Sequence, residues 1–265
     1  MPDQERQILF ELAEAVRASR PVVLATVVGT RRSTPRHSGT KMLVFEDGET
    51  SGTIGGGEME ARVVAAASEA LSDQRPRLLE YALVDPRRGD PGICGGEVKI
   101  YLEPYMPRHT VYVVGCGHVG RAVVDLAHWL GYRTVAIDDR PEAVTAEALP
   151  HADERVVGSL ANLGRRIEED ASIVLVTRNV DLDALVLPEA LASPARYIGV
   201  MGSTSRWRAV ATRLTEAGVQ PGDLERVHSP IGIELQAETL EEIAVSILSE
   251  IIQVNRSPAT EPEPA

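Results

Sequence analysis

The sequence of 265 residues is 43% hydrophobic, enough to bury the core of one large domain or two ordinary ones. Its formal net charge of -12 argues against nucleic-acid or membrane-surface binding, because both need a broad basic face. The two cysteines stand in glycine-rich stretches, the N-terminus lacks the apolar run of a signal peptide, and no apolar run reaches the ~18 residues of a membrane span. We therefore expect a cytoplasmic protein without a disulfide framework.

The first hundred residues predict an N-terminal mixed α+β domain. Apolar residues at helical spacing predict a helix over 4–18, and PVVLATVVG predicts a buried strand. The stretch KMLVFEDGETSGTI predicts a hairpin, because two β-rich runs flank Asp47 and Gly48. A helix opens after the triple glycine at 55–57, and two more strands read RLLEYAL and EVKIYLEPY. The prolines of EPYMPRH indicate a boundary, so we expect this domain to span 1–106.

Strands and helices alternate from Val111 onward. The strands read TVYVVG, RTVAID, ERVVG, SIVLVT and RYIGVMG, with helical stretches between them. This alternation predicts a doubly wound parallel sheet over 107–256 that closes with an apolar-faced helix in TLEEIAVSILSEIIQVN. The apolar face of that helix is a candidate surface for a homodimer, and the sequence does not decide the oligomeric state. The Pro/Glu-rich tail over 257–265 predicts disorder.

A dinucleotide fingerprint opens the second domain. Gly115, Gly117 and Gly120 follow the first strand at GxGxxG spacing, and Asp138 ends the next strand, about 20 residues on. We expect Gly115 to make the tight turn, Gly117 to approach a pyrophosphate, Gly120 to pack closely, and the Asp138 carboxylate to accept from ribose hydroxyls. The pattern predicts a Rossmann-like domain. The same glycines also satisfy the turn and the packing without any ligand, so both interpretations stand.

Polar residues follow the later strands, where ligands of such sheets bind. They include Thr177 to Asp181 in the loop TRNVD, Gly202 and Ser203 in MGSTSR, and His228 in HSPIGIE. Cys116 and His118 lie in the glycine turn itself. The two histidines either face one crevice or are satisfied by backbone hydrogen bonds. No spacing typical of a metal site occurs, so no metal site is predicted.

The first domain carries a basic segment. TRRSTPRHSGTK at 30–41 includes Arg36 and Lys41 and no acid, and its hydroxyls, such as that of Ser33, suit phosphate recognition. The triple glycine at a helix N-terminus is a second candidate anion site. In GICGGE, the Cys94 thiol is either a soft ligand or nucleophile, or a small buried hydrophobe.

Motifs across nearly the whole chain resemble the XdhC/CoxI family, accessory factors for xanthine dehydrogenase and related molybdenum hydroxylases. The matching stretches are STPRHSGTKMLV, GTIGGGEME, CGGEVKIYLEP, VVGCGHVGRAV, IDDR, YIGVMGS and HSPIGIELQAETLEEIAVSILSEII. The resemblance implies a chaperone that binds molybdenum cofactor (molybdopterin), assists its sulfuration through a cysteine desulfurase, and hands it to the apo-hydroxylase. Catalysis is not part of this role. The alternatives are an NAD(P)-dependent oxidoreductase, which needs an acid or base at the nicotinamide, and a nucleotide-sensing Rossmann protein.

The resemblance also implies where the cofactor lies. The basic segment and the triple glycine would hold its phosphate, and Cys94 would lie near the metal. Many members carry Cys where this chain has Glu58, and a histidine-rich loop where this chain reads RNVDLD. NAD(P) remains a candidate for the Rossmann domain. The candidate cofactor-binding residues are Ser33, Arg36, Lys41, Gly55, Gly56, Gly57, Glu58, Cys94, Gly95 and Gly96 in the first domain and Gly115, Gly117, His118, Gly120, Asp138, Gly202, Ser203 and His228 in the second.

Overall fold

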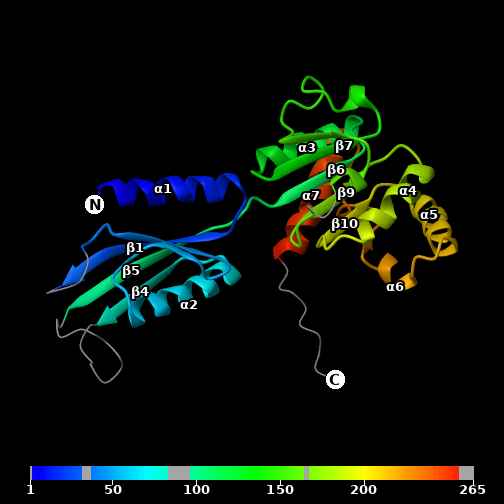
Figure 1. Ribbon diagram of the computed structural model, residues 1–265. Coiled ribbons are helices and arrows are strands. Elements are labelled where there is room, and N and C mark those ends of the chain that lie inside the picture. Colours follow the sequence, from blue (N-terminus) through cyan, green and yellow to red (C-terminus); the bar gives the residue numbers. More distant parts are fainter. Residues whose placement is uncertain (1, 32–36, 83–95, 164–166, 257–265) are drawn as a thin grey trace, which may run out of the picture. The chain divides into compact units, whose positions relative to one another are not determined.

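The computed structural model describes residues 2–31, 37–82, 96–163 and 167–256, which belong to two compact units, Met1–Pro107 and Arg108–Ala265 (Figure 1). The tail over 257–265, for which disorder was predicted, lies outside the described residues. So do four candidate site residues, Ser33, Arg36, Cys94 and Gly95. Within the described residues, no helix combines the length and the apolar character that a membrane crossing requires.

The first unit is an antiparallel sheet with two long helices. Its elements are α1 (Pro2–Arg17), β1 (Val22–Arg31), β2 (Lys41–Phe45), β3 (Thr50–Gly52), α2 (Glu58–Asp73), β4 (Arg77–Ala82) and β5 (Glu97–Tyr105). The strands lie in the order β3-β2-β1-β5-β4, and every neighbouring pair is antiparallel. The predicted helices, hairpin and strands of this half are confirmed.

Alternating burial explains why the two helices cover opposite faces of that sheet (Figure 1). In β5, Val98, Ile100 and Leu102 are buried and form one core with the apolar face of α2, whereas the residues between them are more exposed. On the other face, α1 packs Ile8 and Leu12 into a smaller core over β1 and β2. The triple glycine lies in the short connection from β3 to α2.

The second unit contains the predicted alternation. Its elements are β6 (Thr110–Val114), α3 (His118–Trp129), β7 (Arg133–Asp138), η2 (Pro141–Ala143), β8 (Glu154–Val157), η3 (Leu160–Leu163), β9 (Ser172–Leu175), α4 (Val180–Leu191), β10 (Tyr197–Val200), α5 (Thr204–Glu216), α6 (Pro221–Leu224), β11 (Val227–His228) and α7 (Leu240–Arg256). The sheet is parallel throughout, in the order β11-β10-β9-β6-β7-β8, which is the Rossmann order. The predicted fold class is confirmed.

Two local details differ from the sequence interpretation. Only the first two residues of RNVDLD lie in a loop. Asn179 caps α4 by accepting a hydrogen bond from the Leu182 N–H at 3.0 Å, and the helix starts at Val180. The stretch around HSPIG also contributes a short strand, β11, that was not predicted, since two residues are too few to show a period.

Successive strand residues alternate between the two faces of the parallel sheet. In β6, Val111 and Val113 pack under α3 and α7, while Tyr112 and Val114 pack under α4 and α5. With both faces covered, the strands expose polar loops at their carboxyl ends, along one edge. The strand order reverses between β6 and β9, and this is the position where such sheets form a ligand crevice.

His109, just before β6, is half-buried at the opposite edge of the sheet. Its Nε2 lies 3.0 Å from Ser172 Oγ and 3.2 Å from the Nδ2 of Asn255 on α7. Burial lowers the pKa of His109, although the nearby Asp170 carboxylate opposes this effect. The native protein therefore holds this ring neutral at pH values where the unfolded chain already binds a proton.

We predict that the free energy of unfolding of this unit falls as the pH drops below about 6.5, because the unfolded state then binds more protons than the native state. In His109→Gln the fall between pH 7.5 and 5.5 becomes smaller. Both tryptophans, Trp129 and Trp207, belong to this unit, so urea unfolding followed by tryptophan fluorescence reports on it alone. The control, His128→Gln, removes an exposed histidine of α3; an equal change in both variants would contradict the prediction.

Candidate functional site

A pocket of about 170 Å³ opens at the carboxyl edge of the parallel sheet. Apolar side chains from β6, from the residue after β9 and from α4 form its floor, and charged side chains follow β7 and β9 at its rim. The predicted residues Gly115, Gly117 and Asp138 are brought together here. The lining residues are Val114, Gly115, Gly117, Asp138, Asp139, Arg140, Gly158, Val176, Thr177, Arg178, Leu182 and Val186.

The three glycines of the fingerprint have different reasons to be glycine. Gly115 has a φ of +100°, and a Cβ there would lie 2.7 Å from the carbonyl oxygen of Val176. A Cβ on Gly120 would lie 2.0 Å from the carbonyl oxygen of Gly115. Gly117, by contrast, has a φ of -73° and no atom within 4 Å of such a Cβ. The turn and the helix packing therefore require the first and third glycines, and the fold itself does not require the second.

The Asp138 carboxylate already holds four hydrogen bonds. Its Oδ1 accepts from the backbone N–H and the Nε of Arg140 at 3.0 and 2.9 Å, and its Oδ2 accepts from Arg140 Nη2 and the Cys116 N–H at 2.9 and 2.7 Å. Burial raises the pKa of Asp138, but these bonds outweigh it and the net shift is downward. Four bonds fill the acceptor capacity of a carboxylate, so ribose hydroxyls find no free acceptor on Asp138 in this arrangement.

A second ion pair lies beside the first at the rim of the pocket. Arg178 donates from both terminal nitrogens to the two oxygens of Asp139, each at 2.8 Å. This bidentate contact lowers the pKa of Asp139 to about 2. The sequence analysis named Arg178 only within the stretch Thr177 to Asp181 and did not select Asp139 or Arg140, although both follow β7 directly. Position after a strand end was the signal that would have found them.

The remaining residues of the glycine turn lie elsewhere. The Cys116 side chain is fully buried, and burial raises its thiol pKa to about 12, so it is a small core residue. His118 is exposed and lines a groove between α3 and α7 that also includes Trp129 and Leu240. Neither residue lines the pocket at the sheet edge.

A buried ion pair fills the space after β10. The Asp183 side chain is fully buried, and its Oδ2 accepts from Arg206 Nε at 2.8 Å and Nη2 at 2.5 Å. Thr177 Oγ1 donates to Oδ1 of the same carboxylate at 2.5 Å. Gly202 lies against this arginine, because a Cβ there would be 2.7 Å from Arg206 Cδ. Ser203 caps α5 by accepting from the Arg206 N–H at 3.2 Å. The residues MGSTSR thus have a structural explanation.

His228 belongs to a second polar cluster, centred on Glu250 of α7. Its Nδ1 lies 2.9 Å from Glu250 Oε1, while Glu250 Oε2 accepts from the hydroxyl of Tyr197 and the N–H of Gly232, each at 2.6 Å. The histidine ring also packs on Tyr197 at a centroid distance of 4.7 Å. The cluster ties the HSPIG segment to the last helix. His118 and His228 therefore have different surroundings.

In the first unit, the triple-glycine loop binds a carboxylate of its own chain. Glu60 Oε1 accepts from the N–H groups of Ile54, Gly55 and Gly56 at 3.1, 3.3 and 2.8 Å, and from Thr53 Oγ1 at 2.5 Å. Burial raises the pKa of Glu60, but the four hydrogen bonds outweigh it, and the pKa is lowered overall. The predicted anion site at these glycines thus contains an anion that the chain itself supplies.

The other described candidates of this unit lie on either side of that loop. Lys41 begins β2, and its Nζ donates to the carbonyl of Gly39 at 2.9 Å. Glu58 begins α2, where Arg62 donates to its Oε1 at 3.0 and 2.5 Å. The other oxygen, Oε2, is buried and has no hydrogen-bond partner among the described residues. Gly96 is buried directly before β5.

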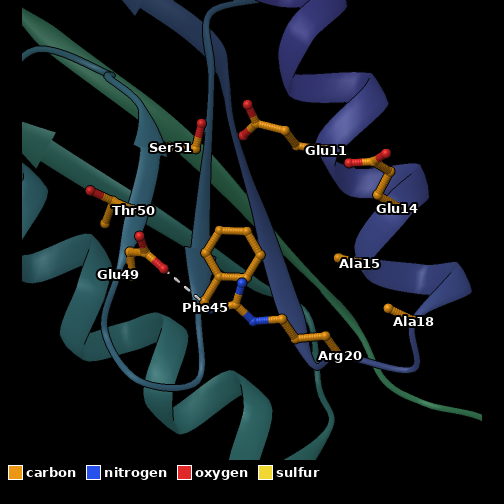
Figure 2. Close-up of a pocket in the computed structure, with 9 residues that line it drawn as sticks. All are labelled: Glu11, Glu14, Ala15, Ala18, Arg20, Phe45, Glu49, Thr50 and Ser51. Carbon is orange, nitrogen blue, oxygen red and sulfur yellow. Dashed lines mark hydrogen bonds and ion pairs between the residues drawn. The ribbon is translucent and has the colours of Figure 1, made fainter.

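A larger pocket of about 480 Å³ lies between α1 and the β2–β3 hairpin (Figure 2). Glu11 and Glu14 project from α1 on one side, and Glu49 lies on the other. The guanidinium of Arg20 stacks 3.9 Å from the centre of the Phe45 ring and pairs with Asp47 and Glu49 at 3.0 and 3.3 Å. Three carboxylates against one paired arginine make this pocket unsuited to an anionic ligand. None of the predicted site residues that the structure describes lines it.

Comparison with known proteins identifies both halves of the chain. Residues 111–251 match the XdhC Rossmann domain, and residues 15–82 match the XdhC and CoxI family. The chain belongs to the XdhC and CoxI family. The resemblance inferred from the sequence motifs is confirmed.

Relatives of this XdhC-family chain differ in how much of their length it spans. It is 32% identical, over 94% of its length, to the uncharacterized protein YqeB of Escherichia coli (strain K12), of which it spans 46%. It is 23% identical to the molybdenum cofactor insertion chaperone PaoD of the same organism, over 96% of this chain and 90% of that one. A protein of Bacillus subtilis described as a probable xanthine dehydrogenase subunit is 26% identical over 59% of this chain and 46% of its own length. The chain thus spans about half of two of these relatives.

The fold also recurs in a solved structure. A crystal structure described as a xanthine dehydrogenase from Bacillus halodurans superposes with a TM-score of 0.51, at 24% sequence identity. The match covers 95% of this chain and 97% of the other. It shows that both units occur together in the same architecture.

We predict that Glu60→Ala destabilises the triple-glycine loop, because several donors then lose a charged acceptor, at a cost of about 1–3 kcal/mol in unfolding free energy. Amide hydrogen exchange at residues 54–56 should accelerate, and the effect should disappear in acid, since the carboxylate contributes above its ordinary pKa and is lost as the pH falls through the lowered one. Glu69→Ala, an exposed residue on the same helix, is the control. Unchanged exchange at these amides would refute the assignment.

We also predict that the Cys116 thiol does not react in the native protein, because it is fully buried and its pKa is raised to about 12. In a Cys94→Ser background, a chromogenic disulfide reagent at pH 8 should find no thiol until urea is added, and one thiol afterwards. Rapid labelling without urea would contradict the burial of this side chain.

Proposed function

We propose that this protein binds molybdenum cofactor and delivers it to a xanthine dehydrogenase-type molybdenum hydroxylase. The observation that carries the proposal is the end-to-end match with the insertion chaperone PaoD, over 96% of this chain and 90% of that one. The match includes both units, so it rests on more than the Rossmann fold, which hosts many unrelated functions. A role as a carrier requires binding and release, and no catalytic residue is assigned.

The basic segment is the element best suited to the phosphate of the cofactor. The carboxylate of Glu60 already occupies the amides of Gly55 and Gly56, and its negative charge would repel a second anion at the same place. Lys41 lies at the described end of the basic segment and is half-buried, with its Nζ on a backbone carbonyl. The proposal therefore places the phosphate at Lys41 together with Ser33 and Arg36, and gives the triple glycine a supporting role.

Glu58 supplies a test of whether the residues fit a pterin. The ring of molybdopterin carries an amine and a ring N–H, both hydrogen-bond donors. A buried carboxylate oxygen without a partner is costly, and Glu58 Oε2, at the start of α2, has no hydrogen-bond partner within the described ranges. A pterin donor would satisfy it, so the residues present fit the group. When bound, the cofactor supplies the molybdenum centre that the client needs, and this chain holds and protects it.

Two finer parts of the proposal rest on the family resemblance. Cys94 is proposed to lie near the metal end of the cofactor, where a thiolate suits a soft ligand. A cysteine desulfurase is proposed to supply the sulfur while the cofactor is bound, before transfer to the apo-hydroxylase. Both concern a partner or a residue outside the described ranges, and both depend on cofactor retention being shown first.

We predict that protein purified from cells able to make molybdenum cofactor retains pterin and molybdenum in equal amounts. Arg36→Ala and Cys94→Ala should each lower this content severalfold, because one removes a charge at the phosphate and the other a thiol at the metal. The control, Arg17→Ala, removes an exposed arginine from α1. Pterin fluorescence of the oxidised extract and molybdenum by mass spectrometry give the readout.

Two results would contradict this proposal. If both variants retain as much cofactor as the control, the proposed placement is wrong. If the unmodified protein carries neither pterin nor molybdenum, the proposal of a carrier fails altogether.

A further inference from the structure

We propose that the groove between α3 and α7 is the surface through which two copies of this chain pair, with a twofold axis between their α3 helices. The two helices lie side by side on one face of the parallel sheet (Figure 1), and their outer sides line a groove of about 450 Å³. The inference concerns the second unit only and does not depend on molybdenum cofactor binding.

Exposed apolar side chains gather in this groove. Trp129, the last residue of α3, is 78% exposed, and Leu240 and Val245 of α7 are 38% and 44% exposed. Among the described residues, these are three of the six large apolar side chains that the second unit exposes. Apolar surface in water costs free energy, and tryptophan is a typical anchor of protein interfaces. The groove therefore has the composition of a surface that another protein covers.

The charges of the groove complement each other, which favours a second copy as the partner. His118 and Arg121 lie at the start of α3, whereas Asp125 lies one turn further along and Glu241 begins the facing part of α7. Among the described residues, Arg121 has no ion-pair partner, and Asp125 pairs with the exposed His151 at 2.9 Å. A partner of one charge sign would meet a like charge in part of the groove. A second copy turned by 180° brings Arg121 of each chain to Asp125 of the other, so both signs are matched.

The spacing of residues along α3 fits an antiparallel pairing of two such helices. Positions 118, 122, 125 and 129 lie on one side of the helix, because they are three or four residues apart. With the twofold axis between Ala122 and Asp125, His118 of one copy faces Trp129 of the other. Ala122 is small and lies beside the axis, so the helices can approach closely. Each Trp129 then covers the end of the partner's groove where Leu240 is exposed.

The first test is sedimentation velocity of the full chain over micromolar concentrations, where a reversible dimer should form. Trp129→Ala should raise the dissociation constant of the dimer at least about tenfold, because it removes an aromatic anchor from both sides of the interface. Leu185→Ala is the matched control, since Leu185 is 65% exposed on α4, which covers the other face of the sheet. The dissociation constant of this control should equal that of the unmodified protein.

An exchange of charges tests the twofold arrangement. Arg121→Asp brings carboxylates together across the interface, and Asp125→Arg brings guanidinium groups together. Each variant alone should therefore be monomeric at concentrations where the unmodified chain is dimeric. An equimolar mixture of the two variants should form a heterodimer, because each residue at position 121 again faces an opposite charge at position 125.

Three results would overturn the inference. The unmodified chain could stay monomeric over the whole concentration range, which would leave the groove to a different protein. A dimer could persist in Trp129→Ala and in both charge variants, which would place the contact on another surface. The two charge variants could also fail to pair when they are mixed, which would exclude the twofold arrangement.

A spectroscopic measurement on chains with an intact groove covers the case in which a variant does not fold. Urea unfolding followed by the fluorescence of Trp207 shows whether Trp129→Ala folds. If it does not, Trp207→Phe decides, because Trp129 is then the sole tryptophan. Its emission should shift to shorter wavelength as the protein concentration rises, since pairing removes the indole from water. Emission that does not change with concentration would overturn the inference.

Discussion

The second unit depends on one close contact, that between Gly120 and the carbonyl of Gly115. A Cβ at Gly120 would lie 2.0 Å from that oxygen, so no other residue allows α3 to begin directly at the end of β6. Because α3 starts there, its first turn faces the carboxyl ends of the neighbouring strands, and its apolar side can pack against α7 and the sheet. The crevice at the switch point is a result of this contact, whether or not a ligand enters it.

Hydrogen bonds from the chain to its own carboxylates are the second constraint on the structure. Asp138, Asp183, Glu60 and Glu250 each accept hydrogen bonds from their own chain, and each fixes a segment that the sequence presents as a possible binding loop. Asp183 shows the size of the effect. Removing one partner of a buried ion pair typically lowers the free energy of unfolding by about 3–5 kcal/mol, because the other charge is left without compensation. In a chain of net charge -12, carboxylates therefore serve as internal anions, and a loop rich in N–H groups is not automatically a site for an external one.

This explains how much of the molecule could be predicted from the sequence. Apolar periods and glycine spacing depend on neighbours along the chain, so the parallel sheet, the hairpin and the turn at Gly115 were predictable. The partner of a backbone N–H is a property of three-dimensional position. Nothing in the stretch GTIGGGEME indicates that Glu60 turns back onto the amides of Gly55 and Gly56 rather than toward solvent. The same holds for Arg206, which reaches Asp183 across 23 residues of chain, and for His228, whose partner Glu250 lies on the last helix.

The three fingerprint glycines separate fold from function. A motif match treats the three glycines as one signal. That signal alone does not distinguish a turn that only builds the fold from a turn that also binds a ligand. The backbone conformation requires glycine at position 115, and a close contact with the backbone requires it at position 120. At Gly117, by contrast, a Cβ would lie in open space. Gly117 is therefore the glycine of the fingerprint that the fold does not explain.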